Sequence, residues 1–339
     1  MRRAIAAFVL TLLLPLYPAA QGSRGVPAQV ERLFAQAHLS PDERKQALAG
    51  MPVARPLPAD ASKELAVFGV LWINAPVERY LQRLNDIEQL ERGGRFKLTK
   101  RISSPPVLSD FAALRLPDED VRDLQSCRVG DCELKLGESA IQRFQSDVNW
   151  KLANPRAAVD AVMQRFAYDH VAAYLRGGDA QLPVYRDGSR AISAAAEFRD
   201  MVSRMDELPI YGPELRRYLV EFPVATLPNA TSFLYWQQTE FGLKPIIRIS
   251  HMTIYRRDTD TIVASKMIYA THYFWTALEL RALVPDPSRG SGFWLLTTSR
   301  SRTDGLSGLT GLFIRHRVRS EVVDGTLKVL TSTKEKLEL

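Results

Sequence analysis

Six polar side chains with acid/base or anion-binding chemistry lie within or at the ends of apolar, β-branched runs between residues 244 and 302. They are His251, Lys266, Tyr269, His272, Arg300 and Arg302. An imidazole titrates near neutral pH and suits proton transfer, whereas a guanidinium can hold an anionic group through two parallel hydrogen bonds. We therefore expect that these side chains either point to solvent or line a partly polar cavity.

These residues also have structural interpretations, since a histidine without a nucleophile or carboxylate partner in a motif is more often a hydrogen-bonded structural residue. Lysine is rarely buried, which favours a sheet edge or solvent for Lys266. Arg300 and Arg302 could pair with Asp304 or with acidic residues of a neighbouring loop. We assign no catalytic residue and expect contact with a ligand. The candidate ligand-binding residues are His251, Tyr255, Lys266, Tyr269, His272, Trp294, Arg300 and Arg302.

The sequence lacks the motifs that identify the common enzyme classes. HExxH, GxSxG, Walker A and GxGxxG patterns do not occur at useful positions, so hydrolase, nucleotide and dinucleotide sites are not favoured. The net charge of +7 is spread along the 339 residues, and no reader motif occurs, so nucleic-acid binding is not indicated. We expect neither a cofactor nor a metal.

The first residues have the pattern of an export signal. The chain starts with MRR, continues with an almost unbroken apolar stretch at residues 4–16, and offers a small-x-small cleavage pattern at residues 20–22. This stretch is shorter than the roughly 20 residues that span a bilayer. We therefore predict that residues 1–22 are a signal peptide, with cleavage favoured over retention as an anchor, and that the protein is periplasmic or secreted.

The two cysteines fit that location. Cys127 and Cys132 lie in the segment CRVGDC, in which Gly130 and Asp131 indicate a turn. Their spacing lacks the CxxC geometry of redox motifs, and no cysteine or histidine other than this pair lies between Cys127 and His170 to complete a metal site. A structural disulfide between them is therefore expected in an oxidising compartment.

The front of the chain combines helices and strands. Residues 26–50 predict a helical lead-in with a capping box that starts at Ser40, and the prolines of residues 51–61 indicate an extended linker. Residues 64–73 form an apolar run typical of a strand. A helix that Asn74 is expected to cap follows, and residues 95–102 alternate as a half-buried strand does.

Helical patterns dominate residues 138–218, including a long amphipathic helix that begins at Asn154 and Pro155. Residues 218–224 and 232–237 are then plausible strands. Residues 244–302 predict a meander of antiparallel strands, rich in Ile, Val, Tyr, Phe, Trp and Thr and interrupted by turn residues.

A long amphipathic helix is expected after the meander, capped by Thr303 or Asp304 and running to about residue 336. Three glycines near its start recur every third residue, which would let a backbone or a ligand come close. These are Gly305, Gly308 and Gly311. Its outer face is basic and could contact anionic lipid. The basic residues near its start are Arg315, Arg317 and Arg319.

The strand at residues 64–73, the helix in INAPVERYLQRLNDIEQL, the antiparallel strands and the long C-terminal helix together resemble the helix-grip fold of the START/polyketide-cyclase-like (SRPBCC) superfamily. In that family a curved sheet grips the last helix and encloses an elongated apolar cavity. The resemblance covers residues 63–102 and 219–339, and it implies binding of a lipid, sterol-like, isoprenoid or aromatic molecule. The helical block between them departs from the family pattern, and fold alone does not assign an activity.

The sequence thus predicts an α+β protein in which a curved antiparallel sheet grips a long C-terminal helix and a helical insertion interrupts the domain. The expected divisions are a signal peptide (1–22), a helical lead-in with a proline-rich linker (23–62), the first part of the helix-grip-like domain (63–136), the insertion (137–218) and the second part (219–339).

The expected function is an exported binding protein for a hydrophobic or amphipathic small molecule, held without covalent chemistry in a cavity between sheet and helix. One alternative is a cyclase-like or hydrolase-like enzyme that uses His251, Tyr269 or His272 in the same cavity. Another is an envelope-associated structural or interaction protein whose basic C-terminal helix contacts the membrane surface.

Overall fold

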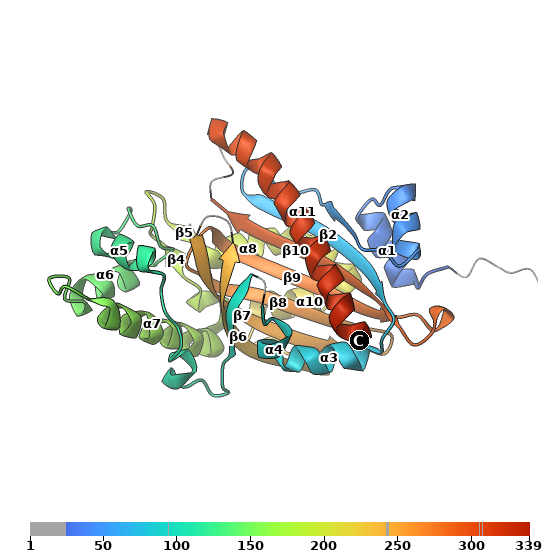
Figure 1. Cartoon of the computed structure of the whole chain (residues 1–339), viewed down its shortest axis with the longest axis horizontal. Coiled ribbons are helices and arrows are strands. Elements are labelled where there is room, and N and C mark those ends of the chain that lie inside the picture. The colour runs from blue at the N-terminus through green and yellow to red at the C-terminus, as the bar shows by residue number, and fades with distance from the viewer. Residues whose placement is uncertain (1–24, 94, 242–243, 305, 307) are drawn as a thin grey trace, which may run out of the picture.

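An eight-stranded antiparallel sheet is the centre of the computed structural model, which describes residues 25–93, 95–241, 244–304, 306 and 308–339 (Figure 1). Its strand order is β1-β2-β10-β9-β8-β7-β6-β3. The strands are β1 (Val53–Pro56), β2 (Glu64–Ile73), β3 (Phe96–Arg101), β6 (Ala230–Phe241), β7 (Lys244–Arg256), β8 (Thr261–Ala270), β9 (Phe274–Pro285) and β10 (Phe293–Thr303). The predicted α+β class is confirmed, and β10 returns to pair with β2.

Helices lie on both faces of this sheet. They are α1 (Ala28–Gln36), α2 (Pro41–Leu48), α3 (Val77–Asn85), α4 (Ile87–Leu90), α5 (Asp118–Ser126), α6 (Glu138–Asp147), α7 (Arg156–Gly177), α8 (Ala194–Ser203), α9 (Leu208–Tyr211), α10 (Leu215–Glu221) and α11 (Gly308–Glu338). A small hairpin of β4 (Val184–Tyr185) and β5 (Ile192–Ser193) precedes α8. The capping box predicted at Ser40 and Glu43 is present at the start of α2.

The predicted linker contains an edge strand. Residues 53–56 form β1, which pairs with β2 from Val53 opposite Val70 to Pro56 opposite Val67. Proline lacks the N–H that a central strand would need, but it is tolerated at an edge and at strand ends. The prolines that indicate a linker in the sequence are therefore compatible with this short strand.

Two helix boundaries also differ from the sequence prediction. The strand expected at residues 218–224 is absent from the structure, and residues 218–221 instead complete helix α10, because Leu215, Tyr218 and Leu219 follow helical spacing and bury one face together. Helix α3 starts at Val77, and Pro76 rather than Asn74 occupies its N-cap position.

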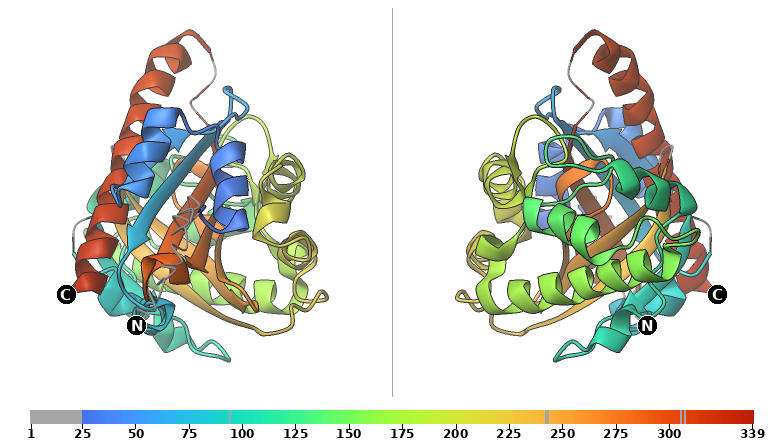
Figure 2. Two further views of the ribbon diagram at one scale, coloured as in Figure 1. Left: turned by 90° about the vertical axis from the view of Figure 1, so that its right-hand side faces the viewer. Right: turned by 90° about the vertical axis from the view of Figure 1, so that its left-hand side faces the viewer.

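The two faces of the sheet carry different helices (Figure 2). We call the face that α11 and α3 cover the α11 face; there Leu71 and Ile73 of β2 pack in one cluster with Leu330 and Leu337 of α11. On the opposite face, the alternate residues of β2 pack with α1, α8, α9 and α10, and strands β6–β8 pack with α6 and α7. The helical insertion and the C-terminal helix are therefore separated by the sheet.

Helix α11 approaches β2 closely at Gly69. A Cβ atom at this position would lie 2.8 Å from Cγ2 of Thr326 and 3.1 Å from Cδ1 of Leu330. Glycine is therefore required by the contact between helix and strand. Gly305 lies outside the described residues, as do the side chains of residues 308–316, including that of Arg315.

The predicted disulfide is present between Cys127 and Cys132, directly after α5, with an S–S distance of 2.04 Å. A disulfide is consistent with an extracytoplasmic location. The predicted signal peptide lies outside the described residues. Within the described part of the chain, no helix has both the length and the apolar composition needed to cross a bilayer.

Candidate functional site

Lys266 of β8 lies on the face of the sheet opposite to the α11 face, which we call the opposite face. Its side chain is 2% exposed, so it is neither at a sheet edge nor in solvent as the sequence suggested. Its Nζ donates to the carboxylate of Asp179 and, at 2.6 Å, to the carbonyl oxygen of Leu219. The ammonium also lies 4.0 Å from the ring centroid of Phe198 in α8. Burial lowers the pKa of Lys266 to about 8, while Asp179 opposes this shift. The insertion thus supplies the counter-charge that sequence spacing could not reveal.

His251 pairs with Lys266 across β7 and β8 and lies in the same buried layer. Its Nδ1 is 3.0 Å from the hydroxyl oxygen of Tyr174 in α7, and its ring packs against Phe222. Burial, followed by the charge of Lys266, lowers the pKa of His251 to about 3. The imidazole is therefore neutral at physiological pH, and it is buried beneath α7.

Tyr269 and His272 are also covered by helices. The ring of Tyr269 packs edge-on against Phe166 of α7 in the hydrophobic cluster under that helix. The Nε2 atom of His272 lies 3.0 Å from Oδ1 of Asp120 in α5, and its Nδ1 lies 3.1 Å from the carbonyl oxygen of Glu133. These partners join α5 and the disulfide loop to the end of β8.

Arg300 and Arg302 of β10 form ion pairs on the opposite face. Arg300 pairs with Glu64 of β2 at 2.7 Å and with Glu207 at 2.6 Å. Arg302 pairs with Glu197 of α8 at 2.7 Å and with Asp200 at the same distance. Neither pairs with Asp304, whose carboxylate contacts Lys135 instead. Both guanidinium groups therefore connect the sheet to the insertion.

The aromatic candidates also belong to the opposite face. Trp294 is fully buried among aromatic neighbours, and its Nε1 donates to Asp286 at 3.1 Å. Tyr255 is partly buried beside α10. The structure thus places the eight candidates named from the sequence against neighbouring helices and loops, and most of them contact the insertion.

A different set of polar residues lies on the α11 face, towards β3 and α4. We call it the α11-face polar cluster. It consists of Tyr80, Glu91, Thr99, Tyr235, Gln237, Arg248, Ser265, Glu279 and Arg281. The register of the paired strands places the strand residues of this cluster on the same face of the sheet as Leu71 and Ile73, which is the face that α11 covers.

Gln237 is the central connection of the cluster. Its side chain is fully buried, its Oε1 accepts a hydrogen bond of 2.9 Å from Nε of Arg248, and its Nε2 donates to the carboxylate of Glu91. Glu91 also accepts from the hydroxyl of Thr99 at 3.2 Å. Burial raises the pKa of Glu91, although the charges of Arg248 and Arg281 oppose that shift.

The second half of the cluster is an ion pair. Arg281 of β9 donates through Nε to Glu279 at 2.8 Å and through Nη1 to the hydroxyl of Tyr80 at 3.0 Å. The side chains of Glu279 and Arg281 are 29% and 16% exposed. Tyr235 reaches across to Ser265 at 3.2 Å. Although most members of the cluster are buried, the Glu279–Arg281 pair therefore remains partly exposed to solvent.

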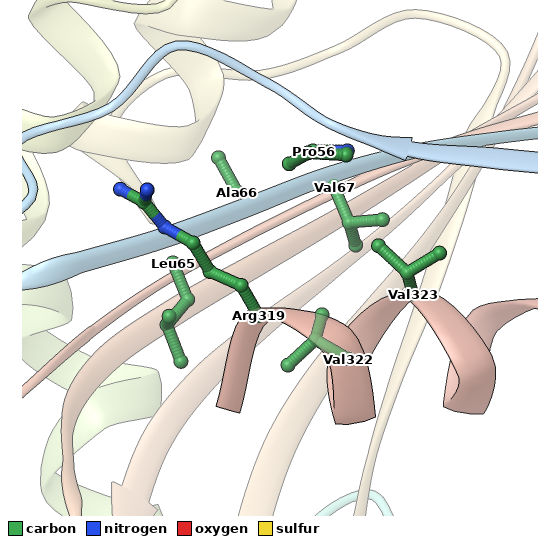
Figure 3. Close-up of a pocket in the computed structure, with 7 residues that line it drawn as sticks. All are labelled: Pro56, Leu65, Ala66, Val67, Arg319, Val322 and Val323. Carbon is green, nitrogen blue, oxygen red and sulfur yellow. The ribbon is translucent and has the colours of Figure 1, made fainter. Parts of the chain in front are cut away.

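A hollow between α4 and β3 adjoins the cluster, and Glu91 and Thr99 belong to both. It measures about 350 Å³ including the solvent at its mouth. A smaller hollow of about 180 Å³ lies where α11 crosses the edge formed by β1 and β2 (Figure 3). Its lining consists of Pro56, Leu65, Ala66, Val67, Arg319, Val322 and Val323. Because this second lining offers one charged side chain among aliphatic ones, the α4–β3 hollow and its cluster are the stronger candidate site.

Sequence reasoning missed the cluster for a definite reason. Its members come from α3, from the residue that follows α4 and from five strands, and each strand also carries polar residues on its other face. The alternation of Tyr235 and Gln237 with buried Trp236 in β6 is a usable signal, since it shows two polar residues on one side of a strand. Only the register shows that Arg248 lies opposite Gln237.

Comparison with protein-family models gives no match, and comparison with curated proteins gives no match either. The fold itself is α+β, with a large antiparallel sheet and a C-terminal helix, and this arrangement is compatible with a helix-grip shape.

Proposed function

We propose that the protein is a helix-grip-like binding protein that holds an amphipathic small molecule on the α11 face of its sheet. The polar part of the ligand contacts the α11-face polar cluster, and its apolar part lies along the sheet towards α11. The predicted signal peptide and the disulfide support an exported protein. Membership of the START/polyketide-cyclase-like superfamily is part of the same proposal, on the basis of the strand and helix order.

The observation that carries this proposal is the contrast between the two faces. On the opposite face the cationic side chains of Lys266, Arg300 and Arg302 are buried and paired with carboxylates. On the α11 face Glu279 and Arg281 remain partly exposed, and the same face has apolar residues such as Met252 and Met267. Ligand sites combine a mostly apolar surface with a few convergent polar groups. The α11 face has that composition.

Catalysis by His251, Tyr269 or His272 receives no comparable support. These side chains are fully buried or nearly so, and they contact α5, α7 and neighbouring loops. A contact of α11 with anionic lipid is likewise not favoured, since the exposed Arg317 pairs with Glu321 on the same helix at 2.9 Å. The binding role on the α11 face is therefore the function that we propose.

Fluorescence titration tests this proposal. Delipidated protein is titrated with 11-(dansylamino)undecanoic acid, an amphipathic probe whose emission rises in an apolar site. We expect saturable binding that unlabelled dodecanoic acid displaces. The absence of saturable, displaceable binding by folded protein would refute the proposal.

A steric variant locates the site. Ser299 of β10 is partly buried on the α11 face and pairs with Glu279 in the register. We expect Ser299→Phe to weaken probe binding by at least about tenfold, since the ring would fill space above the cluster. Ser203→Phe, at the exposed end of α8, is the matched control and should leave binding unchanged. Equal binding by the two variants, with native circular dichroism, would place the site elsewhere.

A further inference from the structure

Arg248 differs from the other inward-facing arginines of the sheet. Arg281, Arg300 and Arg302 each have a carboxylate within ion-pair distance. In the described part of the chain, Arg248 has no such partner, and its hydrogen bonds go to the neutral amide oxygen of Gln237. A partly buried guanidinium without a bonded counter-ion attracts an anion from solution.

The surroundings hold Arg248 in a fixed orientation. Gln237 is fully buried and is itself held by Glu91, so its Oε1 fixes Nε and Nη2 of the guanidinium. Among the described residues, Nη1 has no protein acceptor, and the side chain is partly exposed. One edge of the guanidinium is thus bound to protein and another is available to a ligand.

Apolar side chains continue from this group along the same face. Ile246 precedes Arg248 by two positions in β7, and Ala270 lies opposite Arg248 in β8. Ile246 and Ala270 form a small cluster with Met267 and Phe274, separate from the cluster under α3 and the C-terminal half of α11. A charged group and a small apolar cluster therefore meet at Arg248.

We propose that Arg248 is the anion-binding residue of the α11 face and that the ligand is an amphipathic anion, either a carboxylate or a phosphate ester on an apolar chain. This inference rests on the proposed binding function and adds the chemistry of the head group. A guanidinium suits both kinds of head group, because its planar N–H donors match a pair of anionic oxygens.

Glu91 makes binding of such an anion dependent on pH. Its carboxylate lies one amide away from Arg248 and, when ionised, repels an incoming anion. The other polar groups around it are Tyr80 of α3, Glu88 of α4, Thr99 of β3, Tyr235 of β6, and Glu279 and Arg281 of β9. Because an anionic neighbour favours the neutral carboxyl, binding is accompanied by proton uptake at Glu91, and affinity rises as pH falls.

The charge on the head group is tested with two probes, 11-(dansylamino)undecanoic acid and its methyl ester. We expect the wild-type protein to bind the acid more tightly, and Arg248→Gln to weaken binding of the acid by roughly tenfold to a hundredfold while leaving the ester unchanged. Arg248→Lys should recover part of the loss. Arg217→Gln, at an exposed position of α10, is the control and should bind as wild type does.

Two displacement arms distinguish the head groups. Dodecyl phosphate, dodecanoic acid and inorganic phosphate are each tested as competitors of the fluorescent acid. The compound that displaces the probe most effectively identifies the chemical class of the head group. Displacement by dodecyl phosphate or dodecanoic acid supports an amphipathic ligand. Displacement by inorganic phosphate at similar concentrations would overturn that part of the inference, because the apolar chain would then contribute nothing.

A substitution at Glu91 tests the proposed pH dependence of anion binding. Glu91→Gln should bind the acid more tightly near neutral pH and lose the rise in affinity that we expect of wild type as pH falls. If wild type binds neither probe, the proposed function fails. If it binds both equally and Arg248→Gln changes nothing, the binding function stands and the anion inference is wrong.

Discussion

Buried charges on the opposite face are held by specific partners. Lys266 illustrates the principle, since its ammonium is enclosed by Asp179, the carbonyl of Leu219 and the ring of Phe198. Such a pair adds little net stability compared with apolar residues of the same volume, because both ions lose their hydration. Losing one partner is costly, since the other charge then remains buried alone. These residues therefore act chiefly as connections between sheet and insertion.

Replacing Lys266 by methionine tests this role. We expect Lys266→Met to lower the free energy of unfolding by about 3–5 kcal/mol at neutral pH, because Asp179 loses its counter-charge. Burial already raises the pKa of Asp179. In the variant the folded state would bind a proton that the unfolded state releases, so the deficit should shrink as pH falls. Urea unfolding at two pH values measures this.

The double variant Lys266→Met with Asp179→Asn is the control for that experiment. It removes both charges and should recover much of the loss. A single variant as stable as wild type would contradict the role of the pair.

The buried histidines predict instability towards acid. Burial lowers the pKa of His170 to about 4 and that of His251 to about 3, both below the ordinary value of 6.5. At pH values between the lowered pKa of each folded histidine and the ordinary value of 6.5, the unfolded chain binds protons that the folded chain does not, so stability falls as pH drops below about 6.5. From about pH 6.5 to about pH 4.5 the expected loss is roughly 2–3 kcal/mol per histidine.

The variant His251→Gln isolates one contribution. Its stability should depend less steeply on pH than that of wild type in this interval, and urea unfolding at several pH values gives the difference between the two profiles. Parallel profiles would show that His251 titrates normally in the folded protein.

At the residue scale, sequence could identify the polar residues but not the face that each occupies. Lys266 and Ser265 are neighbours in the chain, yet one is sealed under the insertion and the other belongs to the α11-face polar cluster. A register irregularity further changes the alternation along β8, because Ser250 pairs with Met267 whereas the preceding Ile249 pairs with Tyr269. Counting alternate residues along a single strand therefore could not show which side chains form the site.

At the scale of elements, the contact of α11 with β2 depends on a residue without a side chain. Gly69 lets the helix lie against the strand, with Thr326 and Leu330 directly above it. The sequence analysis instead expected glycines of the C-terminal helix to allow a close approach, and the close approach at β2 was not predicted. A glycine inside an otherwise continuous apolar strand is the signal that could have indicated it.

Adding one methyl group at this position should separate the two elements. In Gly69→Ala the Cβ atom would lie 2.8 Å from Thr326 and 2.9 Å from Thr297, and both contacts are with stiff β-branched side chains. We expect a loss of about 1–3 kcal/mol in thermal or chemical unfolding.

Gly188→Ala is the matched control, since a Cβ atom there has no neighbour within 4 Å. It should change stability by less than about 0.5 kcal/mol. Equal effects of the two substitutions would show that α11 does not press on β2.

The elements that the sequence predicted best are those with long, uniform patterns. The strand Glu64–Ile73 and the meander from Lys244 were readable because both faces of these strands are covered, which produces continuous apolar runs. The edge strand at Val53–Pro56 and helix α10 are short, and each depends on packing against neighbours. Local patterns carry little information about such elements.

At the scale of the whole molecule, the insertion and the sheet share hydrophobic cores. Val159 and Met163 of α7 pack in the same cluster as Trp236, Ile249 and Tyr269 of the sheet. Without these helices, that sheet face and the charge of Lys266 would be open to water. The insertion is therefore part of one folding unit and not an appended lid.

This arrangement predicts one cooperative unfolding transition. Far-ultraviolet circular dichroism reports mainly the helices, whereas tryptophan fluorescence reports mainly the sheet, which carries four of the five tryptophans, the fifth being Trp150 of the insertion. We expect the two signals to give the same midpoint in urea, because neither layer keeps its core alone. Separate midpoints would mean that the insertion unfolds independently.

The pairing of β2 with β10 also determines at what point during synthesis the sheet can form completely. Glu64 contacts Arg302 across 238 positions of the chain, so the first long strand waits for the last one to be synthesised. Closing so long a loop costs chain entropy before any pairing energy is gained. Until then β2, buried on both faces in the finished protein, has no partner on its β10 side and is an edge open to other chains. The same pairing that holds α11 over the sheet therefore makes assembly a late event, in which aggregation competes with folding.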